Sequence, residues 1–150
     1  MQWHRVCTVS ELQQRPRRFL LDGQHIAVWM WKERPFALDA NCYHAGGPLE
    51  QAADIEDIAG QPCIRCPLHK YVISIETGES FYQPVEFRRC EQTRKLLALP
   101  LAWKSKGVKQ RTHRAKIEGD AVWVGLTPRI HPVESDTYAK LHLSRVKTTS

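Results

Sequence analysis

Four residues in two short segments have the types and the spacing of a metal site. The first segment is Cys42-Tyr43-His44, and the second, Cys66-Pro67-Leu68-His69, begins after a gap of 21 residues. Thiolate is a soft ligand that suits zinc and the iron of iron–sulfur clusters, and imidazole suits the same metals. The two Cys/His pairs therefore predict a metal centre on Cys42, His44, Cys66 and His69, with zinc and an iron–sulfur cluster both open.

The remaining cysteines and histidines are weaker candidates. Cys63 lies three residues before Cys66, which is the spacing of half a zinc knuckle, but a core cysteine on the strand that leads into the second segment is the simpler interpretation. Cys7 and Cys90 have no predicted chemistry. The other histidines lie in polar surroundings and are interpreted as surface or hydrogen-bonded residues; they are His4, His25, His113, His131 and His142.

The elements that must position the two segments are predicted to be short strands. Runs rich in β-branched and aromatic residues recur between turn signals, at 3–9, 26–31, 71–75 and 121–126. Asp22-Gly23 and Glu118-Gly119-Asp120 each separate two such runs, so both predict β-hairpins. A short helix can begin near Ser10, but Pro16 limits its length. The sequence therefore predicts an all-β protein.

Two segments show no regular pattern. Residues 84–107 contain six Lys or Arg and no clear period, which predicts a long loop or insertion. Residues after Pro128 are expected to form a tail on the surface. At 150 residues the chain suits one domain, 1–150, with metal-binding loops at about 42–49 and 63–71.

The residues around the two pairs resemble the Rieske [2Fe-2S] ferredoxin-like family. The resemblance rests on Cys42-x-His44 followed by glycine and Leu49, on Cys66-Pro67-x-His69, and on the later Thr77-Gly78. Wider similarity, to the stand-alone soluble Rieske domain-containing proteins of animals, takes in Lys70-Tyr71, Tyr82-Gln83, 105–111 and 135–139.

This resemblance implies one [2Fe-2S] cluster, with Cys42 and Cys66 on one iron and His44 and His69 on the other. It also implies a sandwich of small antiparallel sheets, with the two ligand loops forming a subdomain at one end. Replacing two thiolates by neutral imidazoles makes such a cluster easier to reduce than one held by four cysteines.

The chain departs from its relatives at several positions. Relatives often have glycine after the second histidine, where this chain has Lys70. The high-potential respiratory members have a cysteine in each loop that forms a disulfide, where this chain has Gly47 and Leu68. They also have a serine and a tyrosine where this chain has Tyr71 and Ile73, which predicts a low, ferredoxin-like potential.

The function expected from this resemblance is that of a one-electron carrier, with no catalytic residues, between a flavoprotein reductase and an acceptor enzyme. A Rieske oxygenase also needs a mononuclear iron site in a large second domain, for which 150 residues leave no room. The alternative is a zinc-binding module for nucleic acid or protein. It is disfavoured because no stacking motif or recognition helix accompanies the positive charge.

Composition indicates the charge of the partners and the cellular compartment. The net charge of +6 favours acidic partners, and the basic segment 104–116 is interpreted as a solvated face or as a docking patch for an acidic redox protein. No apolar stretch reaches the roughly 18 residues that cross a membrane, and no secretory signal is visible. An odd number of cysteines, five, is typical of a reducing compartment, so a cytoplasmic protein is expected.

Overall fold

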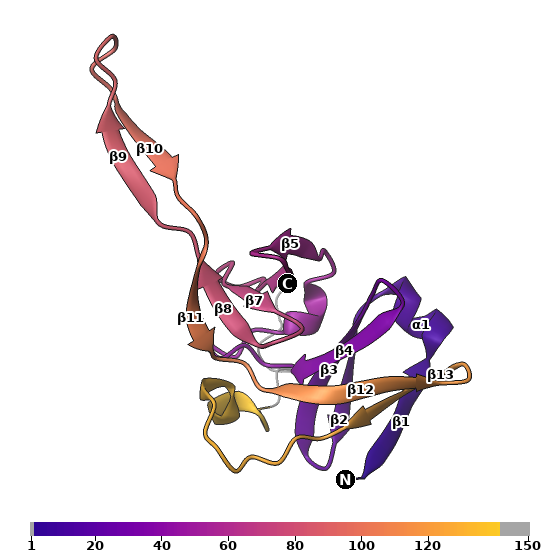
Figure 1. The fold of residues 1–150 in the computed structure, drawn as a ribbon. Helices are drawn as coiled ribbons and strands as arrows, with labels where there is room; N and C mark the ends of the chain where they lie inside the picture. The colour runs from indigo at the N-terminus through magenta and orange to yellow at the C-terminus, as the bar shows by residue number, and fades with distance from the viewer. Residues whose placement is uncertain (1, 142–150) are drawn as a thin grey trace.

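The computed structural model describes residues 2–141 and shows an all-β fold (Figure 1). Over these residues the strands form three sheets of six, five and two strands, in which all pairings between strands are antiparallel. The predicted fold class is therefore confirmed. Among the described residues, no helix has the length and apolar character needed to cross a membrane.

The six-stranded sheet contains both predicted hairpins. Asp22 and Gly23 both have positive φ, 49° and 75°, which is the backbone of the tight turn expected there. The strands, in spatial order, are β1 (Trp3–Thr8), β13 (Ala121–Gly125), β12 (Thr112–Glu118), β4 (Arg34–Asp39), β3 (Gln24–Trp31) and β2 (Arg17–Leu21).

The short predicted helix is α1 (Val9–Gln14), and its N-cap is Thr8. The Thr8 hydroxyl accepts a hydrogen bond from the Glu11 backbone N–H at 3.1 Å, and a Glu11 carboxylate oxygen accepts one from the Thr8 N–H at 2.8 Å. This reciprocal capping box places the N-cap two residues before Ser10, so the helix begins at Val9.

The five-stranded sheet holds the second ligand segment. In spatial order its strands are β11 (Lys104–Val108), β8 (Glu79–Tyr82), β7 (Val72–Ser74), β6 (Gln61–Arg65) and β5 (Glu56–Ile58). The second segment is the loop from β6 to β7. The first segment follows β4 and leads into the 3-10 helix η1 (Leu49–Gln51).

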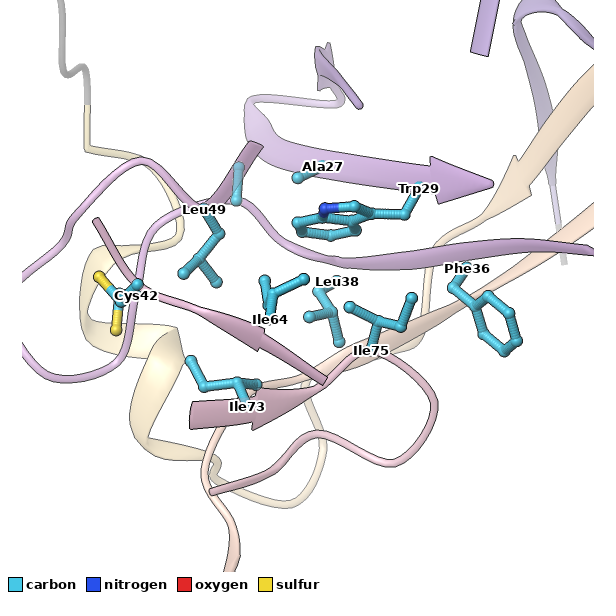
Figure 2. Packing of buried hydrophobic residues seen from close by; sticks show 11 residues of the cluster. Ala27, Trp29, Phe36, Leu38, Cys42, Leu49, Ile64, Ile73 and Ile75 are labelled. Carbon is cyan, nitrogen blue, oxygen red and sulfur yellow. The ribbon is translucent and has the colours of Figure 1, made fainter. Parts of the chain in front are cut away.

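The main core lies between these two sheets (Figure 2). Trp29 and Leu38 from the six-stranded sheet contribute to the same buried cluster as Ile64 and Ile73 from the five-stranded sheet. Cys42 belongs to this cluster, so the first ligand segment rests directly on the core.

The segment predicted as a long loop is in large part regular. Residues 84–107 contain the hairpin of β9 (Val85–Arg89) and β10 (Leu96–Pro100), which projects from the rest of the fold, and they run into β11 (Figure 1). The loop prediction was wrong because both strands are mostly solvent-exposed, and an exposed strand need not alternate apolar and polar residues.

The part of the predicted surface tail that the structure describes differs from the prediction. Residues 128–141 contain the 3-10 helix η2 (Glu134–Tyr138), and Ser135 and Ala139 are buried. Arg111 binds Asp136 through two hydrogen bonds of 2.8 and 2.9 Å, which fixes this helix against the sheet. His142 and the residues after it lie outside the described part of the chain.

Candidate metal centre

Two turns of the same backbone form carry the two Cys/His pairs. In the first, the Cys42 carbonyl accepts the N–H of Gly46 at 2.7 Å and the Cys42 N–H donates to the Gly47 carbonyl at 2.8 Å. In the second, Cys66 makes the same two bonds with Lys70 and Tyr71, both at 2.8 Å. Each pair is therefore held by one hydrogen-bonded turn.

The turns bury the cysteines and expose the histidines. Cys42 is 0% exposed and Cys66 is 2% exposed, whereas His44 and His69 are both exposed. The Cys42 and Cys66 thiols interact closely enough to shift each other's pKa, and the two imidazole rings have their centroids 4.9 Å apart. The structure thus brings all four predicted residues together, as an inner sulfur pair and an outer imidazole pair.

Within residues 2–141, no three or more His, Cys, Asp or Glu side chains are arranged around a single metal position. The four side chains therefore form two pairs, Cys42 with Cys66 and His44 with His69.

The two cysteine sulfurs differ in how readily they ionise. The hydrogen bond from Cys42 lowers the pKa of the Cys66 thiol to about 6, and the same contact, together with burial, raises the pKa of the Cys42 thiol. The backbone N–H groups of His44 and Ala45 point at the Cys42 sulfur, and those of Leu68 and His69 point at the Cys66 sulfur. Such donors stabilise negative charge on sulfur.

Gly47 leaves room that any other residue would fill. A Cβ atom there would lie 2.9 Å from the Cys66 Sγ and 3.0 Å from the side chain of Leu68. The absent side chain lets the first loop pass directly over the second cysteine. The backbone donors and the close approach of the two loops are compatible with an iron–sulfur group bound through the cysteine sulfurs.

Gln110 and Asn41 hold the first loop in place. Gln110 is fully buried; its Nε2 donates to the carbonyls of Asp39 and Asn41, both at 2.8 Å, and its Oε1 accepts the Tyr43 N–H at 2.9 Å. The Asn41 Nδ2 donates to the Tyr138 carbonyl at 2.7 Å. Sequence reasoning gave neither residue this role, although Asn41 adjoins the first pair and Gln110 lies in a segment that carries the wider resemblance.

Tyr71 lies beside the outer pair. Its ring stacks on His44 with a centroid separation of 4.0 Å and an interplanar angle of 19°. The Lys106 Nζ lies 4.7 Å from the centroid of the same ring. The exposed edge of the centre is therefore bordered by an aromatic ring and a lysine.

The other cysteines do not join the centre. Cys63 lies in β6 and is 0% exposed, and burial raises the pKa of its thiol to about 12, which matches the predicted core position. Cys7 is buried near α1, and Cys90 lies in the turn between β9 and β10.

Two of the other histidines are buried rather than on the surface. The His113 Nε2 lies 2.8 Å from an Asp39 carboxylate oxygen, so this residue is hydrogen-bonded, as expected for this group. His25 is 7% exposed.

The basic segment 104–116 is not one solvated face. Arg111 is only 6% exposed because it binds Asp136, whereas Lys104 and Lys106 on β11 are exposed. Part of the predicted face therefore belongs to the interior. The β11 end of the segment borders the candidate metal centre.

The fold, the paired turns and the sequence agree with one protein class. A family model described as the soluble Rieske-type ferredoxin matches residues 6–129. The chain belongs to this family. A Rieske domain-containing protein of Homo sapiens is 36% identical over 131 residues, which cover 87% of this chain and 78% of the human protein.

Solved structures share the fold at lower identity. The ferredoxin of carbazole 1,9a-dioxygenase from Nocardioides aromaticivorans IC177 is 21% identical with a TM-score of 0.56, covering 85% of this chain and all of that chain. A chain from a complex of reduced oxygenase and oxidised ferredoxin in carbazole 1,9a-dioxygenase is 18% identical with a TM-score of 0.57, covering 84% of this chain and 96% of that chain. At this level of identity, the likeness shows the fold alone.

Proposed function

We propose that this protein is a one-electron carrier that holds one Rieske-type [2Fe-2S] cluster. Cys42 and Cys66 would hold one iron, and His44 and His69 would hold the other. The observation that carries the proposal is the division of the four side chains into a buried thiol pair and an exposed imidazole pair, on two turns of the same form. When bound, the cluster supplies reversible one-electron chemistry.

The residues of the chain have distinct parts in this function. The N–H groups that point at the sulfurs stabilise negative charge there, and the core under Cys42 keeps water from the thiol side. His44 and His69 form the exposed edge, which is where an electron can pass to a partner. No residue is assigned a catalytic role, because a carrier makes and breaks no bond in a substrate.

The partners are proposed from the resemblance and from the relatives. One solved relative is a ferredoxin of a dioxygenase, and another comes from a complex of an oxygenase with its ferredoxin. A flavoprotein reductase would give one electron to this protein, and an acceptor enzyme would take the same electron from it. We propose the cytoplasm as its location, since a reducing compartment suits five cysteines that include two thiolate ligands.

Ligand variants test the proposal. The purified protein should be reddish-brown and contain iron and inorganic sulfide. His44→Ala and His69→Ala should each remove the visible absorption and lower the melting temperature, because bound metal stabilises the folded loops. Cys63→Ala should keep the wild-type spectrum. A colourless wild-type protein with one zinc, or a coloured His69→Ala beside a colourless Cys63→Ala, would refute the proposed ligands.

The reduction potential of the cluster should lie in the lower part of the range known for Rieske centres. Rieske centres span roughly −150 to +300 mV, and hydrogen bonds to sulfur are among the factors that raise a potential within that range. The Ile73 side chain is fully buried and apolar, so it cannot donate a hydrogen bond to sulfur, and the Tyr71 ring is stacked on His44. Redox titration followed by electron paramagnetic resonance should give a midpoint in the lower part of the range. A midpoint above about +100 mV would contradict this expectation.

A further inference from the structure

The hairpin of β9 and β10 has no covering layer. We call residues 84–101 the arm; it extends away from both larger sheets (Figure 1). Phe87 is 62% exposed, Leu96 is 61% exposed and Val85 is 46% exposed. A two-stranded hairpin alone in water is marginally stable, and contiguous exposed apolar side chains mark interaction sites.

The register places these apolar side chains on one face of the arm. Residues directly opposite each other in an antiparallel pair point to the same side, and positions two apart share that side. Val85 is opposite Pro100, Phe87 is opposite Ala98, and Arg89 is opposite Leu96. This face is therefore an apolar strip that ends in a basic residue near the turn.

Positive charge is concentrated at the far end of the arm. Arg88 is paired with Glu86 at 2.9 Å, so its charge is partly compensated. Residues 89–95 contain three basic residues, Arg89, Arg94 and Lys95, and one carboxylate, Glu91. The exposed charge of the turn is therefore positive.

The other end of the arm adjoins the candidate metal centre. The Leu101 N–H donates to the Pro84 carbonyl at 2.8 Å and closes the base of the arm. Pro84 lies two residues after Tyr82, the last residue of β8. The Lys106 Nζ lies 5.9 Å from the ring centroid of Tyr82 and 4.7 Å from that of Tyr71, which stacks on His44. The base of the arm therefore lies next to the residues that border the exposed histidine edge.

We propose that the arm is a docking surface for an acidic redox protein whose redox centre is bordered by apolar residues. The apolar strip would cover that border, while the basic turn meets carboxylates farther out. Charge of opposite sign would steer the encounter, and the buried strip would hold the complex together. This inference rests on the proposed function, because it places the partner's redox centre beside His44 and His69.

Two other occupants fit less well. A second copy would bring two basic turns to the same interface, where like charges repel. A membrane would have to bury Arg94 and Lys95 if the arm inserted turn-first, which is costly for charged side chains.

Binding to flavodoxin tests the proposal. Flavodoxin is an acidic protein with an exposed flavin edge in apolar surroundings, and its affinity for the cluster-loaded protein can be measured by isothermal titration calorimetry at low salt. The double variant Phe87→Ser/Leu96→Ser keeps every charge and should bind at least tenfold more weakly. Lys95→Glu should bind severalfold more weakly and show a smaller salt dependence. Leu20→Ser, at a residue 55% exposed on β2, is the matched control and should bind like the wild type.

Separate readouts distinguish this inference from the proposed function. The visible spectrum and its bleaching by dithionite report the cluster, and a protein with no cluster refutes the carrier function whatever the binding result. With the cluster intact, wild-type affinity in Phe87→Ser/Leu96→Ser, or no flavodoxin binding by the wild type, overturns the docking surface.

Two further measurements identify the competing occupants. A wild-type dimer in sedimentation velocity that becomes monomeric in Phe87→Ser/Leu96→Ser would assign the arm to a second copy. Cosedimentation of the wild type with phosphatidylserine vesicles, lost in the same variant, would assign it to a membrane. Either result overturns the proposal.

Discussion

At the scale of single residues, the two ligand turns have different residue types at a position where both have positive φ. The fifth residue of each turn, counted from its cysteine, has positive φ: Gly46 at 75° and Lys70 at 60°. Glycine adopts this backbone without steric cost, whereas a residue with a Cβ is strained there by roughly 1–2 kcal/mol. Lys70, where relatives often have glycine, therefore keeps the turn but makes it less stable.

Lys70→Gly should raise the free energy of unfolding by about 1 kcal/mol, because it removes that strain. Urea denaturation of the cluster-loaded protein, followed by tryptophan fluorescence, measures the change. Lys95→Gly is the control. Lys95 is exposed and is not among the residues with positive φ, so this substitution should slightly lower the free energy of unfolding. Equal losses of stability in the two variants would show that Lys70 is not strained.

At the scale of elements, the first ligand loop depends on partners that are distant in sequence. Gln110 reaches the carbonyls of Asp39 and Asn41 across 71 and 69 positions. Local turn residues predicted two hairpins of the six-stranded sheet but not the third, between β3 and β4 at Lys32-Glu33. Residue types and spacing predicted the four side chains that the structure brings together. The exposed strands of the arm and the contacts of Gln110 have no local signal in one sequence, since they depend on which surfaces the fold brings together.

Gln110→Leu should lower the free energy of unfolding by about 3 kcal/mol, because it leaves buried backbone groups of the first loop without hydrogen bonds. The visible absorption should also decay faster under a chelator, since the loop that carries Cys42 and His44 is loosened. Gln83→Leu is the control, because Gln83 is exposed and makes one bond of 3.2 Å to the Leu101 carbonyl. Similar effects of the two substitutions would contradict the role given to Gln110.

At the scale of the whole molecule, a buried charged network joins the six-stranded sheet to residues 128–141. The Asp39 carboxylate is inaccessible to solvent and accepts hydrogen bonds from Arg129 at 2.7 Å, Ser135 at 2.7 Å and His113 at 2.8 Å. Arg129 also binds Asp136. Burial alone would raise the pKa of Asp39, but these hydrogen bonds outweigh it and lower that pKa. The network therefore needs ionised carboxylates.

The stability of the protein should consequently fall in acid. The hydrogen bond from the Arg111 guanidinium is the main reason that the pKa of Asp136 lies well below its ordinary value of 3.8. A carboxylate whose pKa is lower in the folded state stabilises the fold above the unfolded-state pKa, and this stabilisation is lost as the pH falls through the folded-state pKa. The loss should therefore begin near pH 4 and grow as the pH is lowered further.

Asp136→Asn should be less stable than the wild type at pH 7 and should lose less of its remaining stability between pH 5 and pH 3, because an amide has no charge to lose. Urea denaturation at a series of pH values measures both effects. Glu134→Gln is the matched control. Glu134 is an exposed neighbour whose ion pair, among residues 2–141, is with Lys109, and its substitution should keep the wild-type pH dependence. All three proteins have the same candidate metal centre, so a difference in slope reports on Asp136 itself. A slope for Asp136→Asn equal to that of the wild type would show that this ion pair does not set the acid limit of the fold.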